Sequence, residues 1–251
     1  STAQLFIATF MIVTNILGTI DTKIDLNKKI ANNLERLAND YLDYYFSTHE
    51  TRKTTLSTVI SHEKYSVVDG PFGTQMKVED YCSEGIPILE MDYLEGGTIY
   101  SKIKHFISDI KYEEVKRSTA RPGDLIISKT GTLGLLGVVP ESIDRAIIVS
   151  RLAKITPNIS IISPYVLLLL LKRVAKAKYW ERQSSGSTMP ILNIDIIKNA
   201  PIVIATEMMP LNETINKFYR KIDNVLSENI KLLGLKNMIL PLLMNGQAHL
   251  N

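Results

Sequence analysis

Heptad-spaced apolar residues at both ends of the chain constrain its fold more than any other feature. Apolar positions that alternate steps of four and three residues form a seam along a helix, and such a seam makes the helix supercoil with a partner. In the first segment the seam comprises Val13, Leu17, Ile20, Ile24, Asn27, Ala31, Leu34, Ala38, Tyr41 and Tyr45. In the last segment it comprises Leu211, Ile215, Phe218, Ile222, Val225, Asn229, Leu232, Lys236, Ile239 and Leu243. Two helices from one chain that enclose a domain pair antiparallel, so the sequence predicts an antiparallel coiled coil that acts as a spacer.

Each seam carries one asparagine near its middle, Asn27 in the first helix and Asn229 in the second. A buried asparagine in a seam fixes the register of the pairing at some cost in stability. We therefore expect the pairing surface to centre on these two residues. The full predicted set is Ile20, Ile24, Asn27, Leu34, Ile222, Asn229 and Leu232.

Further apolar residues lie off the two seams. They are Ile30, Leu37, Leu226, Leu233 and Leu235. A pair of helices buries only one stripe of each helix, so a second apolar stripe indicates another partner surface. The simpler alternative is a tether that folds back on its own domain.

Between the helices the pattern changes to short apolar runs separated by turn residues. The turns include Asp69-Gly70-Pro71 and Arg121-Pro122-Gly123-Asp124, and the β-branched runs at residues 125–128, 138–139 and 147–149 favour strands. Ser163-Pro164 begins a leucine-rich helix, residues 193–197 a short helical turn, and residues 201–204 an edge strand. The sequence predicts an α+β fold, with one mixed α/β domain at residues 49–206 flanked by long helices at 1–48 and 207–251.

The composition indicates in which cellular compartment the protein is expected. A hydrophobic content of 45% with 22% charged residues is typical of a folded protein. A single cysteine, Cys82, excludes an intrachain disulfide framework and fits the reducing cytoplasm. The apolar stretch at residues 5–17 is interrupted by polar residues, and the one at 166–171 is too short to span a bilayer. We therefore expect a cytoplasmic protein without a membrane segment.

The positive charge is concentrated in the middle of the chain. Residues 51–205 hold 20 Lys and Arg against 16 Asp and Glu, whereas the helical ends hold 9 against 10. Neutralising phosphates requires a local basic face more than a high net charge, so this distribution is a mild indication of nucleic-acid binding.

No motif for catalysis, metal binding or a cofactor stands out. The four histidines are far apart in sequence and lack the spacing of zinc ligands. The glycine cluster at residues 131–137 lacks the Gly-Lys-Ser/Thr ending of a phosphate-binding loop, and there is no Gly-x-Ser-x-Gly elbow. DNA-base methylation would be expected to use an Asn- or Asp-Pro-Pro-aromatic motif, but the chain contains no Pro-Pro. We expect a non-catalytic protein with no metal and no cofactor.

Four stretches, in this order and spacing, carry a resemblance to a known family. They are residues 15–30 (NILGTIDTKIDLNKKI), 70–73 (GPFG) with 84–88 (EGIPI), 121–125 (RPGDL) with 129–134 (KTGTLG), and 185–190 (SGSTMP) with 240–247 (LPLLMNGQ). The chain resembles the DNA-specificity (S) subunit of type I restriction-modification systems over about residues 12–247.

The resemblance implies a function and partners. In that family each target-recognition domain reads one half of a split site in double-stranded DNA. The helical regions set the gap and bind the methyltransferase (M) subunits, and through them indirectly the restriction (R) subunit. A full-length S subunit has two such domains, whereas this sequence shows one between two helices. We therefore expect a half-length form that assembles as a homodimer through its helices or pairs with another S chain. The alternative is a truncated interaction protein that binds methyltransferase or a full-length S subunit without useful DNA affinity of its own.

Three polar, glycine-containing loops in the middle domain have the composition expected of a DNA-reading surface. Base edges are read by polar side chains, while lysine, arginine and backbone amides hold the phosphates. The predicted contacts are Thr74, Gln75 and Lys77; Lys129, Thr130 and Thr132; and Ser185, Ser187, Thr188 and Asn193. Each loop taken alone could equally be an ordinary turn between strands. Lys102, Lys104, Arg151 and Lys154 are further cations that could contact phosphates or be plain surface charges, and Trp180 is expected in the core.

Overall fold

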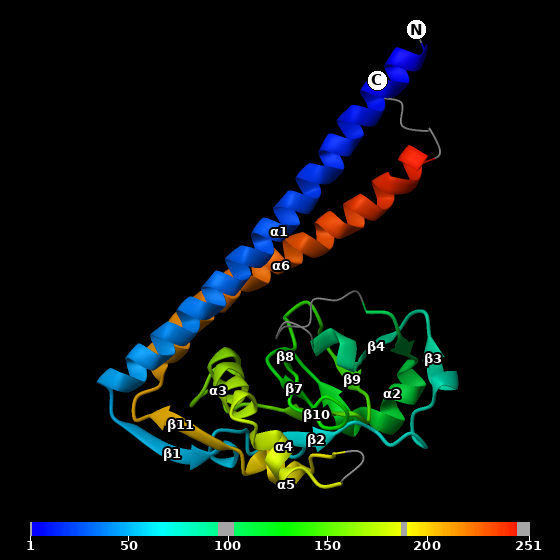
Figure 1. Ribbon diagram of the computed structural model, residues 1–251. Helices are drawn as coiled ribbons and strands as arrows, with labels where there is room; N and C mark the ends of the chain where they lie inside the picture. The colour runs from blue at the N-terminus through cyan, green and yellow to red at the C-terminus, as the bar shows by residue number, and fades with distance from the viewer. Residues whose placement is uncertain (1, 95–102, 187–189, 245–251) are drawn as a thin grey trace. The chain divides into compact units, whose positions relative to one another are not determined.

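The computed structural model describes residues 2–94, 103–186 and 190–244, and its chain divides into two compact units (Figure 1). The helical unit consists of Ser1–Ala38 and Phe218–Asn251, and the mixed unit is Asn39–Lys217. Helix α1 spans Thr2–Thr48 and helix α6 spans Met209–Met244, as the heptad pattern predicts. The units divide within these helices rather than at their ends, so the domain limits at residues 48 and 207 stay a prediction.

In the helical unit, α1 and α6 run antiparallel. Asp21 of α1 contacts Lys236 at 2.6 Å, Lys23 contacts Glu228 at 3.3 Å, and Asn27 donates to the backbone carbonyl of Val225 at 3.3 Å. The residue numbers of the partners on α6 therefore decrease as the residue numbers on α1 increase. Among the predicted seam residues, Ile20, Ile24, Asn27, Ile222 and Asn229 are buried, whereas Leu34 and Leu232 are half-buried.

The two asparagines are joined by one hydrogen bond at the centre of the seam. Nδ2 of Asn27 donates to Oδ1 of Asn229 at 2.8 Å, and Nδ2 of Asn229 donates to the Ile24 carbonyl at 3.3 Å. The Asn27 amide also donates to Glu228, and this hydrogen bond is the main cause that lowers the pKa of the Glu228 carboxyl. Because Asn27 is fully buried, only one register of the two helices gives both side-chain amides these acceptors. Oδ1 of Asn27 accepts no hydrogen bond within the described part of the chain.

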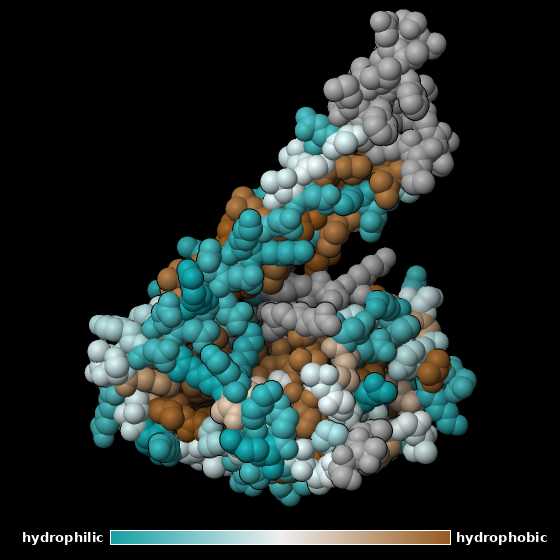
Figure 2. All heavy atoms as spheres, in the orientation of Figure 1, coloured by the Kyte–Doolittle hydropathy of each residue, from teal (hydrophilic) through white to brown (hydrophobic). Residues whose placement is uncertain are grey.

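The second apolar stripe is open to solvent. Leu37, Leu233 and Leu235 are exposed as predicted, whereas Ile30 and Leu226 are half-buried. The exposed set also includes Ile16, Leu26, Ile230, Met238 and Leu240. Figure 2 shows apolar side chains on the surface of the helical pair.

The mixed unit contains a two-stranded ribbon and two larger sheets among its described residues. The ribbon pairs β1 (Thr51–Thr55) antiparallel with β11 (Pro201–Ala205). A four-stranded antiparallel sheet has the order β2 (Val67–Asp69), β10 (Leu152–Ile155), β7 (Leu125–Ser128) and β8 (Leu136–Val138). A five-stranded sheet has the order β3 (Tyr81–Cys82), β5 (Phe106–Ile107), β4 (Ile86–Leu89), β9 (Ala146–Ile148) and β6 (Thr119–Ala120), with β4 and β9 parallel.

Four helices complete the mixed unit in the described part of the chain, apart from the ends of α1 and α6 and short 3₁₀ turns. They are α2 (Asp109–Val115), α3 (Pro164–Lys176), α4 (Tyr179–Gln183) and α5 (Ile194–Lys198). The start of α3 is the predicted one, because the Ser163 hydroxyl accepts a hydrogen bond from the Val166 amide and Pro164 fills the first turn. Its apolar run is buried and packs against β8 and β11, which confirms a core helix.

Trp180 at the start of α4 is fully buried, as predicted, and it packs closely against Gly134 of the glycine cluster. A Cβ on Gly134 would lie 2.2 Å from Cδ1 of Trp180, and Gly134 has a φ of +74°. Only glycine meets both conditions, since a positive φ and close approach each exclude a side chain. The role of Gly134 is thus to let the loop backbone pack against the Trp180 ring.

We expect Gly134→Ala to lower the free energy of unfolding by about 1–3 kcal/mol more than Gly131→Ala, because only the former overpacks the Trp180 pocket. Gly131 is the matched control: its φ is +72°, and a Cβ there would meet nothing nearer than the Met91 methyl at 3.8 Å. Urea unfolding followed by tryptophan fluorescence measures both. Equal losses would show that backbone strain alone matters.

We expect Asn27→Ala to lower the free energy of unfolding by about 1–3 kcal/mol, because it leaves Asn229 without its buried donor. Replacing both asparagines by leucine removes the unsatisfied groups and is expected to be neutral or stabilising. Circular dichroism during urea unfolding measures these changes. Asn32→Ala, at an exposed position of α1, controls for helix propensity. A loss in Asn27→Ala no larger than in this control would contradict a structural role.

Candidate nucleic-acid interface

Two of the three predicted loops are joined by backbone contacts. Ser185 and Ile191 exchange hydrogen bonds of 3.2 and 2.9 Å, Thr130 forms a β-bridge with Ile191, and the Leu192 amide donates to the Lys129 carbonyl at 2.9 Å. The segment around Ile191 therefore lies between the glycine loop after β7 and the loop after α4. Segments more than fifty residues apart in sequence form one surface.

The glycine loop is closed around Ser128, the last residue of β7. The Ser128 hydroxyl donates to the Thr132 carbonyl at 2.5 Å and accepts from the Leu135 amide at 2.8 Å. The Gly134 amide donates to the Ser128 carbonyl at 3.0 Å. Because Ser128 is fully buried, this side chain sets the path of the loop. It leaves Thr132 exposed and Thr130 half-buried.

The third predicted loop follows β2 and is tied to the glycine loop by an ion pair. Oδ2 of Asp69 lies 3.0 Å from Nζ of Lys129. Beyond it the chain turns back on Phe72, whose carbonyl accepts from the Gln75 amide at 2.8 Å and whose own amide donates to Oε1 of Gln75 at 3.1 Å. Thr74, Gln75 and Lys77 are exposed. The side-chain carbonyl of Gln75 thus accepts a hydrogen bond within the loop, and its exposed side-chain amide is left as a donor for a ligand.

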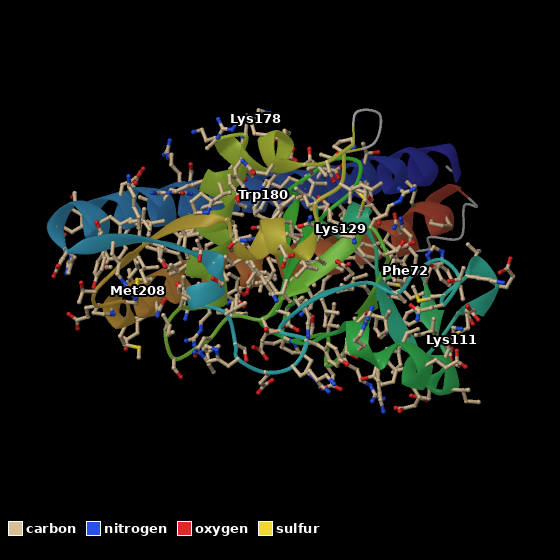
Figure 3. The ribbon with its side chains drawn as sticks, turned by 90° about the horizontal axis from the view of Figure 1, so that it is seen from below. Phe72, Lys111, Lys129, Lys178, Trp180 and Met208 are labelled. Carbon is tan, nitrogen blue, oxygen red and sulfur yellow. The ribbon has the colours of Figure 1, made fainter. Side chains whose placement is uncertain are left out.

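Lys129 does not lie on an open surface. Its side chain is only 13% exposed and its ammonium is held by Asp69 (Figure 3). A phosphate contact through Lys129 would require this ion pair to open. The predicted contact of Lys129 with DNA stays a prediction, and the ion pair and the burial of the side chain oppose it.

The other candidate cations separate into two groups. Lys154 is 3.9 Å from the buried Asp124 carboxylate, and burial lowers the pKa of the Lys154 ammonium and raises the pKa of the Asp124 carboxyl. Lys104 pairs with Asp92 at 2.7 Å, and Lys102 lies outside the described residues. Arg151 is exposed.

The last predicted loop is described only in part. Ser185 is exposed, whereas Ser187 and Thr188 lie outside the described residues. Asn193 is exposed, but its Oδ1 accepts from the Ile196 amide at 2.8 Å and caps α5. Its capping role accounts for an asparagine at this position without DNA.

One exposed aromatic residue in this region was not predicted. Phe72 is 63% exposed at the start of the loop that holds Thr74 and Gln75 (Figure 3). Phenylalanine can contact the thymine methyl group in the major groove. The signal in the sequence is an aromatic residue between turn residues, Pro71 and Gly73, where no apolar periodicity places it in a core.

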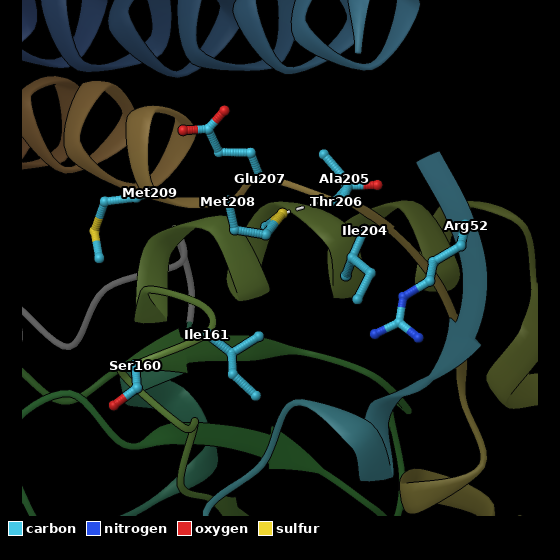
Figure 4. Close-up of a pocket in the computed structure, with 9 residues that line it drawn as sticks. All are labelled: Arg52, Ser160, Ile161, Ile204, Ala205, Thr206, Glu207, Met208 and Met209. Carbon is cyan, nitrogen blue, oxygen red and sulfur yellow. Dashed lines mark hydrogen bonds between the residues drawn. The ribbon is translucent and has the colours of Figure 1, made fainter. Parts of the chain in front are cut away.

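A separate pocket of about 520 Å³ lies where β11 meets α6 (Figure 4). It is lined by Arg52, Ser160, Ile161, Ile204, Ala205, Thr206, Glu207, Met208 and Met209. Met208 directs its sulfur at the Ala205 amide, 3.3 Å away, so this side chain closes the turn before α6. None of the predicted DNA contacts lines this pocket.

The described residues show neither a metal-binding cluster nor a membrane-spanning helix. No group of three or more His, Cys, Asp or Glu side chains there could hold a metal ion. None of the helices in residues 2–94, 103–186 and 190–244 combines the length and the apolar character needed to cross a membrane.

Solved structures establish the fold to which this arrangement belongs. The crystal structure of the type I restriction-modification S subunit from M. genitalium matches with a TM-score of 0.60 and 15% identity, over 95% of this chain and 59% of that one. The HsdS subunit from Thermoanaerobacter tengcongensis matches with a TM-score of 0.50 and 16% identity, over 98% and 58%. The chain has the fold of a type I restriction-modification S subunit.

A third structure with this S-subunit fold comes from work on complex assembly and conformational transition of the type I restriction-modification system. It matches with a TM-score of 0.53 and 15% identity, over 97% of this chain and 60% of that one. The chain thus spans about 60% of the length of the structures it matches. No family model and no curated protein matches the sequence. The resemblance drawn from the sequence motifs is confirmed at the level of the fold.

Proposed function

We propose that this chain is the sequence-specific DNA-recognition subunit of a type I restriction-modification complex. The observation that carries the proposal is the convergence of three polar loops on one edge of the mixed unit in a chain with the S-subunit fold. In this proposal the mixed unit reads one half of a bipartite site in double-stranded DNA, and the helical unit docks methyltransferase subunits.

The loops combine the groups that DNA recognition requires. Thr74, Gln75 and Thr132 offer exposed hydroxyl and amide groups for base edges, and the Ser128 hydroxyl fixes the backbone of the loop that carries Thr132. The excess of basic over acidic residues at 51–205 favours approach to phosphates. No catalytic side chains are needed for this role, because cleavage and methyl transfer belong to the other subunits.

The exposed stripe of the helical unit supports a partner surface. Leu37, Leu233, Leu235 and Met238 are between 40% and 63% exposed, more apolar surface than an isolated helical pair needs. We propose that this stripe binds a second copy of the chain or the methyltransferase, which links it indirectly to the restriction subunit. A two-fold dimer supplies two mixed units, and identical units read identical half-sites.

We expect Gln75→Glu to weaken discrimination at a single base pair by about 1–3 kcal/mol, because the substitution removes the amide donor that pairs with adenine while keeping the acceptor for Phe72. Binding to a panel of single base-pair variants measures the effect. Gln183→Glu, at an exposed position of α4, introduces the same charge as a control. Parallel profiles for the two variants would place Gln75 outside the readout.

We expect the chain to form a homodimer that directs methylation to an inverted repeat with a non-specific gap. Light scattering of the purified chain measures its mass, and methylation-site mapping in cells that carry the chain with its methyltransferase reveals the site. Two different half-sites would indicate pairing with another S chain. A chain that assembles with methyltransferase but directs no methylation would favour the pure interaction protein.

A further inference from the structure

At one end of the four-stranded sheet, the loop after β2 and the glycine loop after β7 both begin beside a single turn. Strand β10 is central, and its first residues pair with the last residues of both neighbours: Leu152 with Ser128 of β7, and Ala153 with Asp69 of β2. Because both pairings are antiparallel, the loops that follow β2 and β7 emerge where β10 begins. The turn that leads into β10 therefore lies between them.

Hydrogen bonds from three directions hold this turn. It closes on itself through the Leu152 amide, which donates to the Val149 carbonyl at 2.9 Å. The Lys129 amide donates to the Arg151 carbonyl at 2.9 Å, and the Gly70 amide donates to the Leu152 carbonyl at 3.1 Å. Each of the two recognition loops thus contributes one backbone donor to the turn.

The approach of the first loop is as close as a backbone permits. A Cβ on Gly70 would lie 2.1 Å from the Val149 carbonyl oxygen, so only glycine allows this contact. On the other side, the Val149 amide donates to the Leu89 carbonyl at 3.1 Å. Arg151 is therefore mounted on a backbone that is fixed from both sides, although its side chain is exposed.

Arg151 and its neighbour Lys129 differ in whether their positive charge is paired. The Lys129 side chain is 13% exposed and its ammonium is paired with Asp69, whereas Arg151 forms no ion pair within the part of the chain that the structure describes. A guanidinium keeps its charge at all relevant pH values and presents five donors in a planar fork. The fork matches the paired acceptors of a phosphate or of the guanine edge.

We propose that Arg151 contacts DNA beside the three loops through its guanidinium, and that Lys129 acts through Asp69 as a positioning residue. The inference rests on the proposed DNA-recognition function. It assigns an electrostatic contact with DNA to a residue outside all three polar loops. This residue lies on the turn before β10, between the first residues of the loops that follow β2 and β7. The acceptor is a pair of oxygen or nitrogen atoms of the duplex, on a phosphate or on guanine.

The test measures the affinity of the complex of this chain with its methyltransferase for a duplex that carries the site found by methylation mapping, at about 50–200 mM salt. We expect Arg151→Ala to weaken binding by about tenfold or more and Lys129→Met to leave the salt dependence unchanged. A phosphate contact reduces the salt slope by about one and is partly restored by Arg151→Lys. A guanine contact concentrates the loss at one base pair, and lysine does not restore it fully. Either result supports the proposal.

The control is Arg117→Ala, which removes an exposed arginine outside the three loops. Thermal melting of each variant establishes that it is folded, and Lys129→Met is expected to melt at a lower temperature because it leaves Asp69 unpaired. If wild-type protein binds and Arg151→Ala behaves as Arg117→Ala does, Arg151 is not the contact and the proposed function stands. If Lys129→Met alone lowers the salt slope, the roles are reversed. Failure of the wild-type complex to bind any duplex would overturn the proposed function together with this inference.

Discussion

The pairing of β1 with β11 is the constraint on which the rest of this chain depends. These strands join the beginning and the end of the mixed unit, with Thr51 opposite Ala205 and Thr55 opposite Pro201. The pairing continues outward, where the Thr206 amide donates to the Glu50 carbonyl at 2.9 Å and the Tyr45 hydroxyl donates to the Glu207 carbonyl at 2.9 Å. Helix α1 therefore ends where α6 begins. Because the chain enters β1 and leaves β11 at the same end of the ribbon, the last turn of α1 lies beside the first turn of α6, and the two helices run antiparallel.

A second constraint places the candidate interface. In an antiparallel sheet a central strand begins where its two neighbours end, so the loops after β2 and β7 share one edge with the turn before β10. The contacts at this edge are mostly backbone hydrogen bonds, together with the Asp69–Lys129 ion pair and the Ser128 hydroxyl. Side chains such as Thr74, Thr132 and Arg151 are not needed to hold the edge together. These side chains can therefore serve the proposed contact with DNA without also holding the fold.

Local patterns in the sequence were sufficient for the helices and for much of the core. Periodicity located α1 and α6, and Asn27 and Asn229 meet because each interrupts an apolar seam near its middle. The Ser163-Pro164 start of α3 and the burial of Trp180 are also local signals. Sequence patterns could not show that Lys129 is neutralised, because its partner Asp69 lies sixty residues away and the contact depends on the register of β2, β10 and β7. They favoured Lys129 over Arg151 for the same reason, since composition within a loop does not reveal which charges are paired across a sheet.

The two stripes of the helical unit differ in chemistry, and this difference separates internal pairing from external binding. The inner seam contains hydrogen bonds of Asn27 and Asn229 that form in only one register, so α1 and α6 of one chain fit each other in a specific way. The outer stripe, with Leu37, Leu233 and Met238, is apolar and carries no comparable polar lock among the exposed residues named above. Apolar contacts are non-directional, and methionine adapts its shape to different neighbours. A surface of this kind tolerates more than one partner, whereas the seam does not. The asparagines thus fix the pairing of α1 with α6, whereas the proposed association through the outer stripe would impose little geometry of its own.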